Sequence, residues 1–272
     1  MNDYLSKDDY EEPMCLLNMH PEINPIPIDR IIKKLDSFLD RDNYSEAEHH
    51  LSYWISEADS NNDMNGKLTV LNEQIGLYRK TGKKAECLHA VEETLNLANS
   101  SGIDGSVTCG TTLINAATGY KAFGKANEAL PLYRKAKSIY EALLNTNDGK
   151  FGGLYNNMAL TLTELGMYEE AKKTYQKAIN VMEKQKNGEL EVAITYLNLA
   201  DLVAAESGLE AGEAEITNYL SKAEELLNTE SLPRNPYYAF VCEKCAPVFG
   251  YYGYFLTERE LNRRAGEIYD RA

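Results

Sequence analysis

Several features that define whole classes of protein are missing or rare in this sequence. Proline is scarce, at 8 of 272 residues, so little interrupts long helices. No run of about 18 apolar residues occurs, and we therefore expect no membrane-spanning helix. The acidic N-terminus, MNDYLSKDDYEEP, lacks the apolar segment of a signal peptide. Five cysteines are an odd number and too sparse for a disulfide scaffold, so we expect reduced thiols and a cytoplasmic location.

Positive charge is also in short supply. The chain has 28 Lys and Arg against 42 Asp and Glu, a net charge of −14. Nucleic acids and anionic membranes attract basic surfaces, so neither is an expected partner. The acidic balance instead favours solubility or a cationic partner. The 43% of hydrophobic residues suffices for a sizeable core.

Motifs of catalysis and of metal binding are absent as well. The sequence has no Ser/His/Asp order, no GxGxxG and no P-loop, and its four His lack the spacing of metal ligands. Cys242 and Cys245 form a CxxC, but zinc needs a second pair of ligands and a redox site needs a βαβ context. We expect these thiols to be small core residues of a helix. The sequence therefore predicts no enzyme, no cofactor and no metal.

What the sequence does contain is a repeat. Gly82, Gly124, Gly166 and Gly208 are each 42 residues apart. Other residues recur at fixed distances from these glycines. Before each Gly there are two columns: Tyr78, Tyr120, Leu162 and Ala204, and farther away Ile75, Ala117 and Ala159. After each Gly there are three columns, in order of distance: Cys87, Ala129 and Ala171; Val91, Tyr133 and Tyr175; and Thr94, Ala136 and Ala178. Apolar stripes with helical spacing on both sides of each Gly predict pairs of antiparallel helices. No pair can bury its stripe alone, so neighbouring pairs are expected to stack.

The repeat predicts an all-α, right-handed superhelical solenoid of five to six helix pairs over residues 29–272. Residues 1–28 are expected to be extended or irregular, and residues 236–272 to form a degenerate capping repeat whose turn lies at Gly250 or Gly253. An earlier unit fits with Leu35, Phe38, Ala47, Leu51 and Trp54 facing inward. In the fourth pair the small residue, Ala200, comes one place early, and SGLEAGEAE is expected to be a loop. Pro131 is expected in or near the first turn of its helix, where its missing N–H matters least.

The best repeat, LYNNMALTLTELGMYEEAKKTYQKA, resembles the tetratricopeptide repeat in its pattern of Leu/Ala, Gly, Tyr, Ala, Tyr and Ala. Its period of 42 rather than 34 residues is similar to the long repeats of kinesin light chains and of peptide-sensing regulators of Gram-positive bacteria. The resemblance covers residues 29–228 well and 236–272 weakly. It implies a protein-interaction fold and, from the second group, a bacterial protein.

A polar column runs along the first helices, which line the concave face in such repeats. Asn115, Asn157 and Asn198 each stand two residues before the small residue, and the preceding unit has Glu73 there, beside Asn72. The outer units have Lys33 and Lys244. A row of amides can pair with the backbone of an extended peptide, and Asn holds peptide backbone at this place in similar repeats. The alternative is that these Asn residues bond between repeats and only fix their packing.

Charges at the two ends of this row would select the peptide. Arg79, Lys80 and Lys121 could meet an acidic side chain or a C-terminal carboxylate. Asp201 and Glu164 lie toward the other end. The two-Lys, two-Asn, one-Arg clamp of chaperone-binding repeats is not assembled in full. The predicted peptide-binding residues are Asn72, Glu73, Arg79, Asn115, Lys121, Asn157, Asn198 and Asp201.

Two further segments leave alternatives open. YYAFVCEKCAPVFGYYGYF is rich in aromatic residues, which indicates a cap over the end of the core or else a homodimer contact or binding patch. PEINPIPIDR is extended by its prolines and could lie along the first helices or in the groove itself.

The sequence thus favours a non-enzymatic module that binds a peptide or protein segment in a concave groove. The second interpretation is a structural scaffold or self-associating adaptor that uses the convex face or the aromatic C-terminal end. A peptide-sensing regulator ranks third, because residues 1–28 are too short for a DNA-binding domain.

Overall fold

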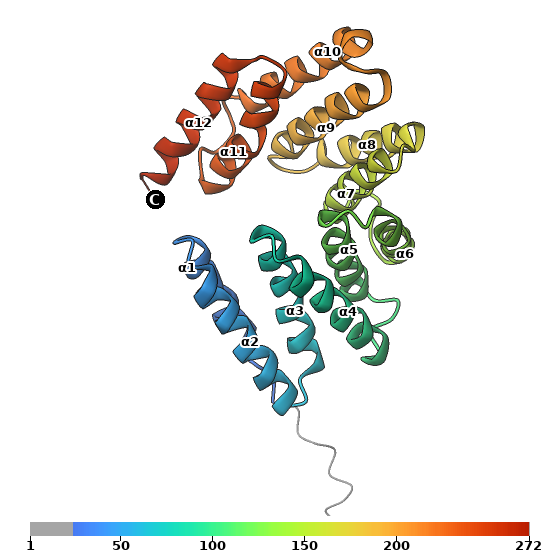
Figure 1. Cartoon of the computed structure of the whole chain (residues 1–272), viewed down its shortest axis with the longest axis vertical. Helices are drawn as coiled ribbons and strands as arrows, with labels where there is room; N and C mark the ends of the chain where they lie inside the picture. The colour runs from blue at the N-terminus through green and yellow to red at the C-terminus, as the bar shows by residue number, and fades with distance from the viewer. Residues whose placement is uncertain (1–23, 272) are drawn as a thin grey trace, which may run out of the picture. The chain divides into compact units, whose positions relative to one another are not determined.

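The computed structural model describes residues 24–271, and this part of the chain consists of twelve helices and no strand. The helices are α1 (Ile28–Leu39), α2 (Tyr44–Ser60), α3 (Met64–Lys80), α4 (Lys84–Ser100), α5 (Val107–Ala122), α6 (Ala126–Leu143), α7 (Lys150–Glu164), α8 (Tyr168–Met182), α9 (Glu189–Ser207), α10 (Leu209–Leu227), α11 (Pro236–Tyr251) and α12 (Phe255–Tyr269) (Figure 1). As the repeat predicted, α1 packs on α2, α5 on α6, α7 on α8, α9 on α10 and α11 on α12. The prediction of an all-α solenoid is confirmed.

The repeat glycines close the helix pairs. Gly82, Gly124, Gly166 and Gly208 all have positive φ, between 71° and 82°. A side chain has a steric cost in this region that glycine avoids, which is why a glycine recurs at these four reversals. In the last pair Gly253 has φ 84°, whereas Gly250 lies within α11. Gly253 is therefore the turn residue of the C-terminal repeat.

The chain divides into two compact units, Met1–Leu77 and Tyr78–Ala272. In the first, Leu35, Ala47 and Leu51 are buried as predicted, and Phe38 and Trp54 pack partly buried against them. The expected boundary at residue 28 coincides with the start of α1, but the proposed organisation of the whole chain stays a prediction.

The residues just before α1 are tied to the start of α3. The backbone N–H of Ile26 donates to Asp63 Oδ2 at 2.9 Å, and Asp63 Oδ1 accepts from the N–H of Gly66 at 2.9 Å. Asp63 therefore caps the N-terminus of α3 and also holds the residues that precede α1. Of the segment PEINPIPIDR, residues 21–23 lie outside the described residues, and residues 28–30 are the first residues of α1.

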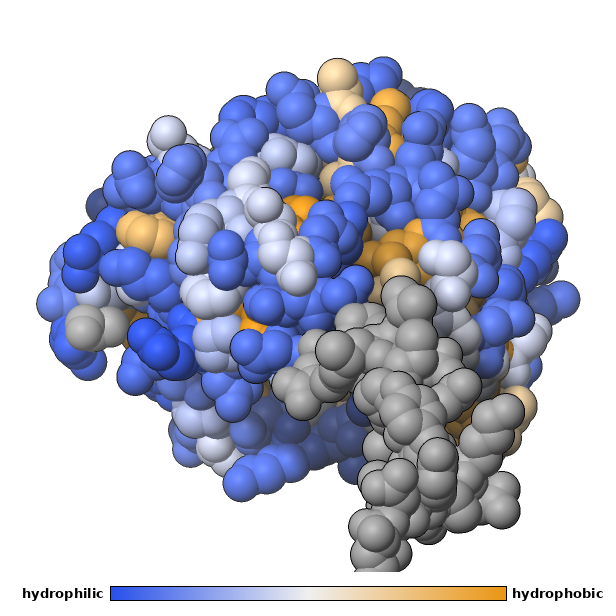
Figure 2. Space-filling model, turned by 90° about the horizontal axis from the view of Figure 1, so that it is seen from below, coloured by the Kyte–Doolittle hydropathy of each residue, from blue (hydrophilic) through white to orange (hydrophobic). Residues whose placement is uncertain are grey.

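In the second unit the helix pairs stack on one another. First helices lie against first helices, α5 on α7, α7 on α9 and α9 on α11. They line the inner side of the curve, and α6, α8 and α10 lie on its outer side (Figure 1). The predicted small and aromatic columns are buried, including Cys87, Ala129, Ala171, Val91, Tyr133, Tyr175, Thr94, Ala136 and Ala178. Outward-facing residues are mostly polar, and the face in Figure 2 is largely hydrophilic.

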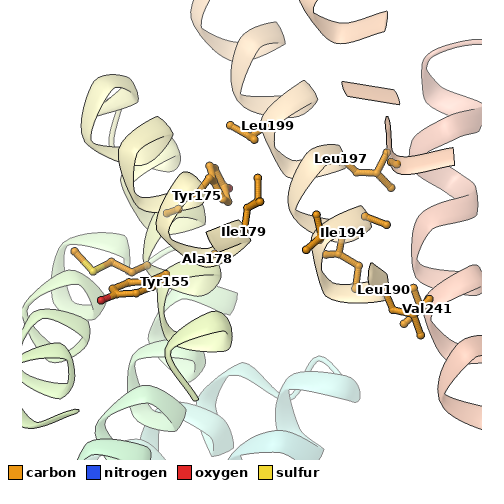
Figure 3. Close-up of a cluster of buried hydrophobic side chains, with 14 of the residues drawn as sticks. Tyr155, Tyr175, Ala178, Ile179, Leu190, Ile194, Leu197, Leu199 and Val241 are labelled. Carbon is orange, nitrogen blue, oxygen red and sulfur yellow. The ribbon is translucent and has the colours of Figure 1, made fainter. Parts of the chain in front are cut away.

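Aromatic and branched side chains fill the spaces between successive pairs. Ile179 of α8 points toward Ile194 of α9, and Leu190 of α9 lies beside Val241 of α11 (Figure 3). Each such side chain contributes about 1.5–3 kcal/mol when fully buried. Because every pair shares its core with the next, the stack is stabilised mainly by contacts between repeats.

Two expectations about helix boundaries were wrong. SGLEAGEAE is not a loop, because α10 begins at Leu209, directly after Gly208, and its predicted core residues Ile216 and Leu220 are buried. The register shift is absorbed by the length of α9 and α10, 19 residues each. Pro131 lies beyond the first turn of α6, not within it. It is exposed, so water can reach the carbonyl that its missing N–H leaves without a helical partner.

Candidate peptide-binding groove

The inner stripe of the first helices carries the predicted Asn column. Asn115 of α5, Asn157 of α7 and Asn198 of α9 are partly exposed, and Lys244 of α11 is exposed at the corresponding position. The small residue two places on is buried in each helix: Ala117, Ala159, Ala200 and Ala246. A helix turns by about 100° per residue, so this spacing sets the polar side chain on the inner stripe and the alanine in the core.

The two adjacent asparagines of α7 have different surroundings. Asn198 Nδ2 donates to Asn156 Oδ1 at 3.0 Å, from one repeat to the previous one. Part of the amide of Asn198 is thus used for packing, which supports the packing alternative for this residue. In contrast, the side-chain amides of Asn115 and Asn157 make no hydrogen bond within residues 24–271. These two amides remain open to a ligand.

Positive charges gather around Lys121, near the C-terminal end of α5. Burial lowers the pKa of Lys121, the Glu164 carboxylate opposes this, and Arg79 and Lys244 lower the pKa further. Charges from three other helices, Arg79 of α3, Glu164 of α7 and Lys244 of α11, therefore act on Lys121. Lys244 was not among the predicted site residues, although its place in the Asn column was a signal that could have included it.

Asp201 is partnered rather than free. The hydroxyl of Tyr252 donates to Asp201 Oδ1 at 2.8 Å. Burial raises the pKa of Asp201, and the hydrogen bond from Tyr252 partly offsets that rise. A second tyrosine, Tyr237, donates to Glu191 of the same helix. These two contacts connect the two ends of α11, where Tyr252 is the C-cap residue, to α9. The Asp201 carboxylate still has lone pairs for a further donor.

A hollow of about 520 Å³ adjoins Asp201 between α9 and α11. Ala204 and Ala205 are small, and Pro247 and Tyr251 form part of the wall. The side chain of Tyr251 is 69% exposed, which is unusual for a large aromatic residue. Its ring therefore adds apolar surface to the otherwise polar inner stripe.

Asn72 and Glu73 belong to the other compact unit, Met1–Leu77, so their membership of the same groove stays a prediction. Asn72 is partly buried. Burial, followed by the charge of Asp36, raises the pKa of Glu73.

The remaining candidates have structural surroundings. Cys242 and Cys245 are buried in α11, and burial raises the pKa of Cys245 to about 12, far from a reactive thiolate. His89 and His49 are exposed, and a ring nitrogen of His50 bonds the Ile31 carbonyl at 3.1 Å. Among residues 24–271 no cluster of three potential metal ligands occurs. No helix in this range is both long and apolar enough to cross a bilayer.

Comparisons with known proteins agree with this architecture. Residues 109–148 and 152–210 each match a sequence model of the tetratricopeptide repeat. A structure of kinesin light chain nearly identical TPR-like repeats from Podosopora anserina superposes with a TM-score of 0.53 at 15% identity, covering 74% of this chain and 94% of that one. BtubC (BKLC) from P. vanneervenii superposes with a TM-score of 0.56 at 18% identity, covering 83% and 90%. At such identities the likeness concerns the fold alone. No curated protein matches the sequence.

Proposed function

Because this chain is a tetratricopeptide-repeat protein, we propose that it is a non-enzymatic interaction module that binds an extended peptide or protein segment along α5, α7, α9 and α11. Stacked helical repeats commonly use their concave surface in this way. The observation that carries the proposal is the pair Asn115 and Asn157. Their amides occupy the same position of successive repeats, 42 residues apart, and are open to a ligand. Each can offer donors and an acceptor to a peptide backbone.

The charges nearby suggest what the peptide carries. Arg79 and Lys244 both lower the pKa of Lys121, and the Glu164 carboxylate is the charge that opposes them. An acidic side chain or a C-terminal carboxylate would relieve the repulsion among these cations. The hollow beside Asp201 would take an apolar side chain of the same segment. A cytoplasmic location and a bacterial origin remain part of the proposal.

Photo-crosslinking tests the groove. Gly153 is exposed on the inner stripe of α7, and a Cβ built there meets no atom within 4 Å. A photoreactive amino acid at Gly153 should therefore not disturb the fold and should crosslink a discrete partner in host lysate. The matched position is Asn218, exposed on the second helix α10. Equal adducts at both positions, or none at Gly153, would contradict binding in the groove.

Self-association is the second candidate, because the C-terminal repeat exposes apolar side chains. Phe255 and Leu256 at the start of α12 are 67% and 84% exposed. The outer face of a terminal repeat is usually polar. A second copy of the chain could cover these residues, and light scattering coupled to size-exclusion chromatography would show a dimer.

A further inference from the structure

The first helix pair has a hollow of about 650 Å³ between α1 and α2, which we call the α1–α2 hollow. It lies wholly within the unit Met1–Leu77, so it involves none of the helices along which we propose that a peptide binds. The residues that line it are Arg30, Ile31, Lys33, Lys34 and Ser37 of α1 and His50 and Trp54 of α2. These positions are about one helical turn apart, so each helix contributes one face to the hollow.

Aromatic rings from both helices form a row beside the hollow. The ring of His50 lies 5.7 Å from that of Phe38 and 6.4 Å from that of Trp54, and the ring of Tyr53 follows at 5.2 Å from Trp54. Phe38 and Trp54 are only partly buried, and Tyr53 is 50% exposed. No described helix precedes α1, so no earlier repeat covers this row, although the end repeat of a solenoid normally needs a polar outer face.

The charged side chains that line the hollow are all positive, in a chain whose net charge is −14. They are Arg30, Lys33 and Lys34, and the lining residues include no carboxylate. All three cations are exposed, and none of them takes part in an ion pair within residues 24–271. The Lys34 ammonium lies over the ring of Phe38, 4.6 Å from its centre. The hollow therefore fits a segment that combines several carboxylates with an aromatic ring.

The chain itself carries such a segment a short distance before α1. Residues 8–12 read DDYEE, four carboxylates around one tyrosine, and Glu12 comes 12 residues before Asn24, the first residue that the structure describes. Twelve extended residues reach up to about 40 Å, whereas α1 is about 18 Å long. The chain is held at Ile26 by Asp63, close to the start of α1. A short tether gives an effective concentration of about 1 mM or more, which favours this segment over a free acidic partner.

We propose that residues 8–12, which lie outside the described residues, dock in the α1–α2 hollow of their own chain. Their carboxylates pair with Arg30, Lys33 and Lys34, and the ring of Tyr10 packs beside Trp54. The contact covers the aromatic row of the first repeat and neutralises its cations. The acidic segment thus caps this end of the repeat stack in place of a further helix.

The fluorescence of Trp54, the only tryptophan, tests the proposal on the full chain. Acrylamide is uncharged, so its quenching reports the exposure of the ring and does not respond to charge. The variant with Asp8→Asn, Asp9→Asn, Glu11→Gln and Glu12→Gln should have a quenching constant about twofold higher, because neutral amides lose the pairing that holds the segment.

A matched variant controls for net charge. Its substitutions, at exposed sites of the second unit, are Glu128→Gln, Glu210→Gln, Glu213→Gln and Glu230→Gln. They remove as many negative charges and should leave the quenching constant of Trp54 at the wild-type value. An unchanged constant in the variant of residues 8–12, or the same rise in both variants, would overturn the proposal.

Removal of the cations gives the reciprocal test. Arg30→Gln, Lys33→Gln and Lys34→Gln together should also raise the quenching constant of Trp54. Adding the substitutions in residues 8–12 to this variant should then cause no further rise, because the pairing is already lost. A combined effect equal to the sum of the two separate effects would show that the segment and the cations act independently, which would contradict the pairing.

Carbodiimide cross-linking distinguishes this segment from the same segment of a second copy. The reagent joins a carboxylate directly to an amine in contact with it, so residues 8–12 should become linked to Lys33 or Lys34. In an equal mixture of unlabelled and isotope-labelled protein, each linked pair of peptides should carry one label only. Linked pairs that combine both labels would assign the hollow to a second copy, and this result or the absence of such links would overturn docking within one chain.

Discussion

The side-chain amide of Asn198 in α9 donates to that of Asn156 in α7 at 3.0 Å, and the two residues are 42 positions apart, one full repeat. The bond joins the inner stripes of neighbouring first helices. It also explains why two asparagines stand side by side in α7. Asn156 connects to the next repeat, whereas Asn157 is the residue that we propose contacts a ligand.

Loss of this bond should destabilise the stack modestly. We expect Asn198→Ala to lower the free energy of unfolding by about 1 kcal/mol, the usual net contribution of a hydrogen bond. Urea unfolding of Asn156→Ala, Asn198→Ala and the double variant would form a double-mutant cycle. The double variant should cost less than the sum of the single variants, and strict additivity would show that the two amides do not interact. Asn115→Ala should stay within about 0.5 kcal/mol of the wild type.

Two helical glycines should respond oppositely to alanine. Gly153→Ala should stabilise the protein by about 0.4–1 kcal/mol, because a Cβ there meets nothing within 4 Å and alanine restricts the unfolded chain. Gly110→Ala should destabilise it, because a Cβ would lie 2.6 Å from the buried ring of Tyr140. That ring is also held by a 2.7 Å hydrogen bond to Thr111. Thermal unfolding would measure both, and a melting temperature that rises in Gly110→Ala would contradict the packing described.

Asp201 should make stability depend on pH in a defined direction. Burial raises its pKa in the folded state above the usual value of 3.8, so the folded protein binds the proton more tightly than the unfolded chain. Its contribution therefore favours folding at low pH and is lost as pH rises above about 4. Relative to Asp201→Asn, the wild type should lose stability as pH rises from about 4 through the raised pKa of the folded state.

The tyrosine partner gives the control for this titration. Tyr252→Phe removes the donor that holds the ionised carboxylate, so the pKa of Asp201 should rise further and the loss of stability with pH should extend to higher pH. A pH profile in Tyr252→Phe that matches that of the wild type would show that the hydrogen bond does not govern the titration.

The cations around Lys121 should be coupled in solution. Lys244→Gln removes a repelling charge and should raise the pKa of Lys121, whereas Glu164→Gln removes an attracting one and should lower it. The titration of the Lys121 side chain can be followed by carbon-detected nuclear magnetic resonance. Unchanged values in both variants would mean that these charges do not share one surface.

The exposed apolar residues of the C-terminal repeat allow self-association to be tested. Phe255→Ser with Leu256→Ser removes exposed apolar surface and should change the melting temperature little. If a second copy covers these residues, the double variant should shift the molar mass from dimer to monomer. A wild type that is monomeric at high concentration would remove the adaptor interpretation.

The repeat could be predicted because its characteristic residues are determined by local structure, either a turn or close helix packing. Glycines with positive φ, such as Gly124, and buried alanines, such as Ala159, recur at fixed spacing, so the helix pairs and their stacking follow from the sequence. The start of α10 could not be derived in this way. Gly208 ends one helix and precedes the next without a loop, and the sequence alone does not show how many residues a turn takes.

The site was less predictable than the fold because partners far apart in the sequence decide each side chain's role. Asn198 and Asn157 occupy the same column, but only Asn198 is bonded to the preceding repeat. Asp201 was predicted as a peptide-binding residue, and nothing in the sequence indicates that Tyr252, 51 residues later, donates to it. Spacing identifies the column, whereas tertiary contacts distinguish its members.

Affinity capture from host lysate with two stability-matched variants tests the central claim most directly. Asn115→Ala with Asn157→Ala removes the open amides, and Asn127→Ala with Asn218→Ala removes exposed amides from the second helices α6 and α10. The account predicts that a partner held by the wild type and by the second variant is lost from the first, while all three melt at the same temperature. A partner that all three retain would contradict binding through the Asn column.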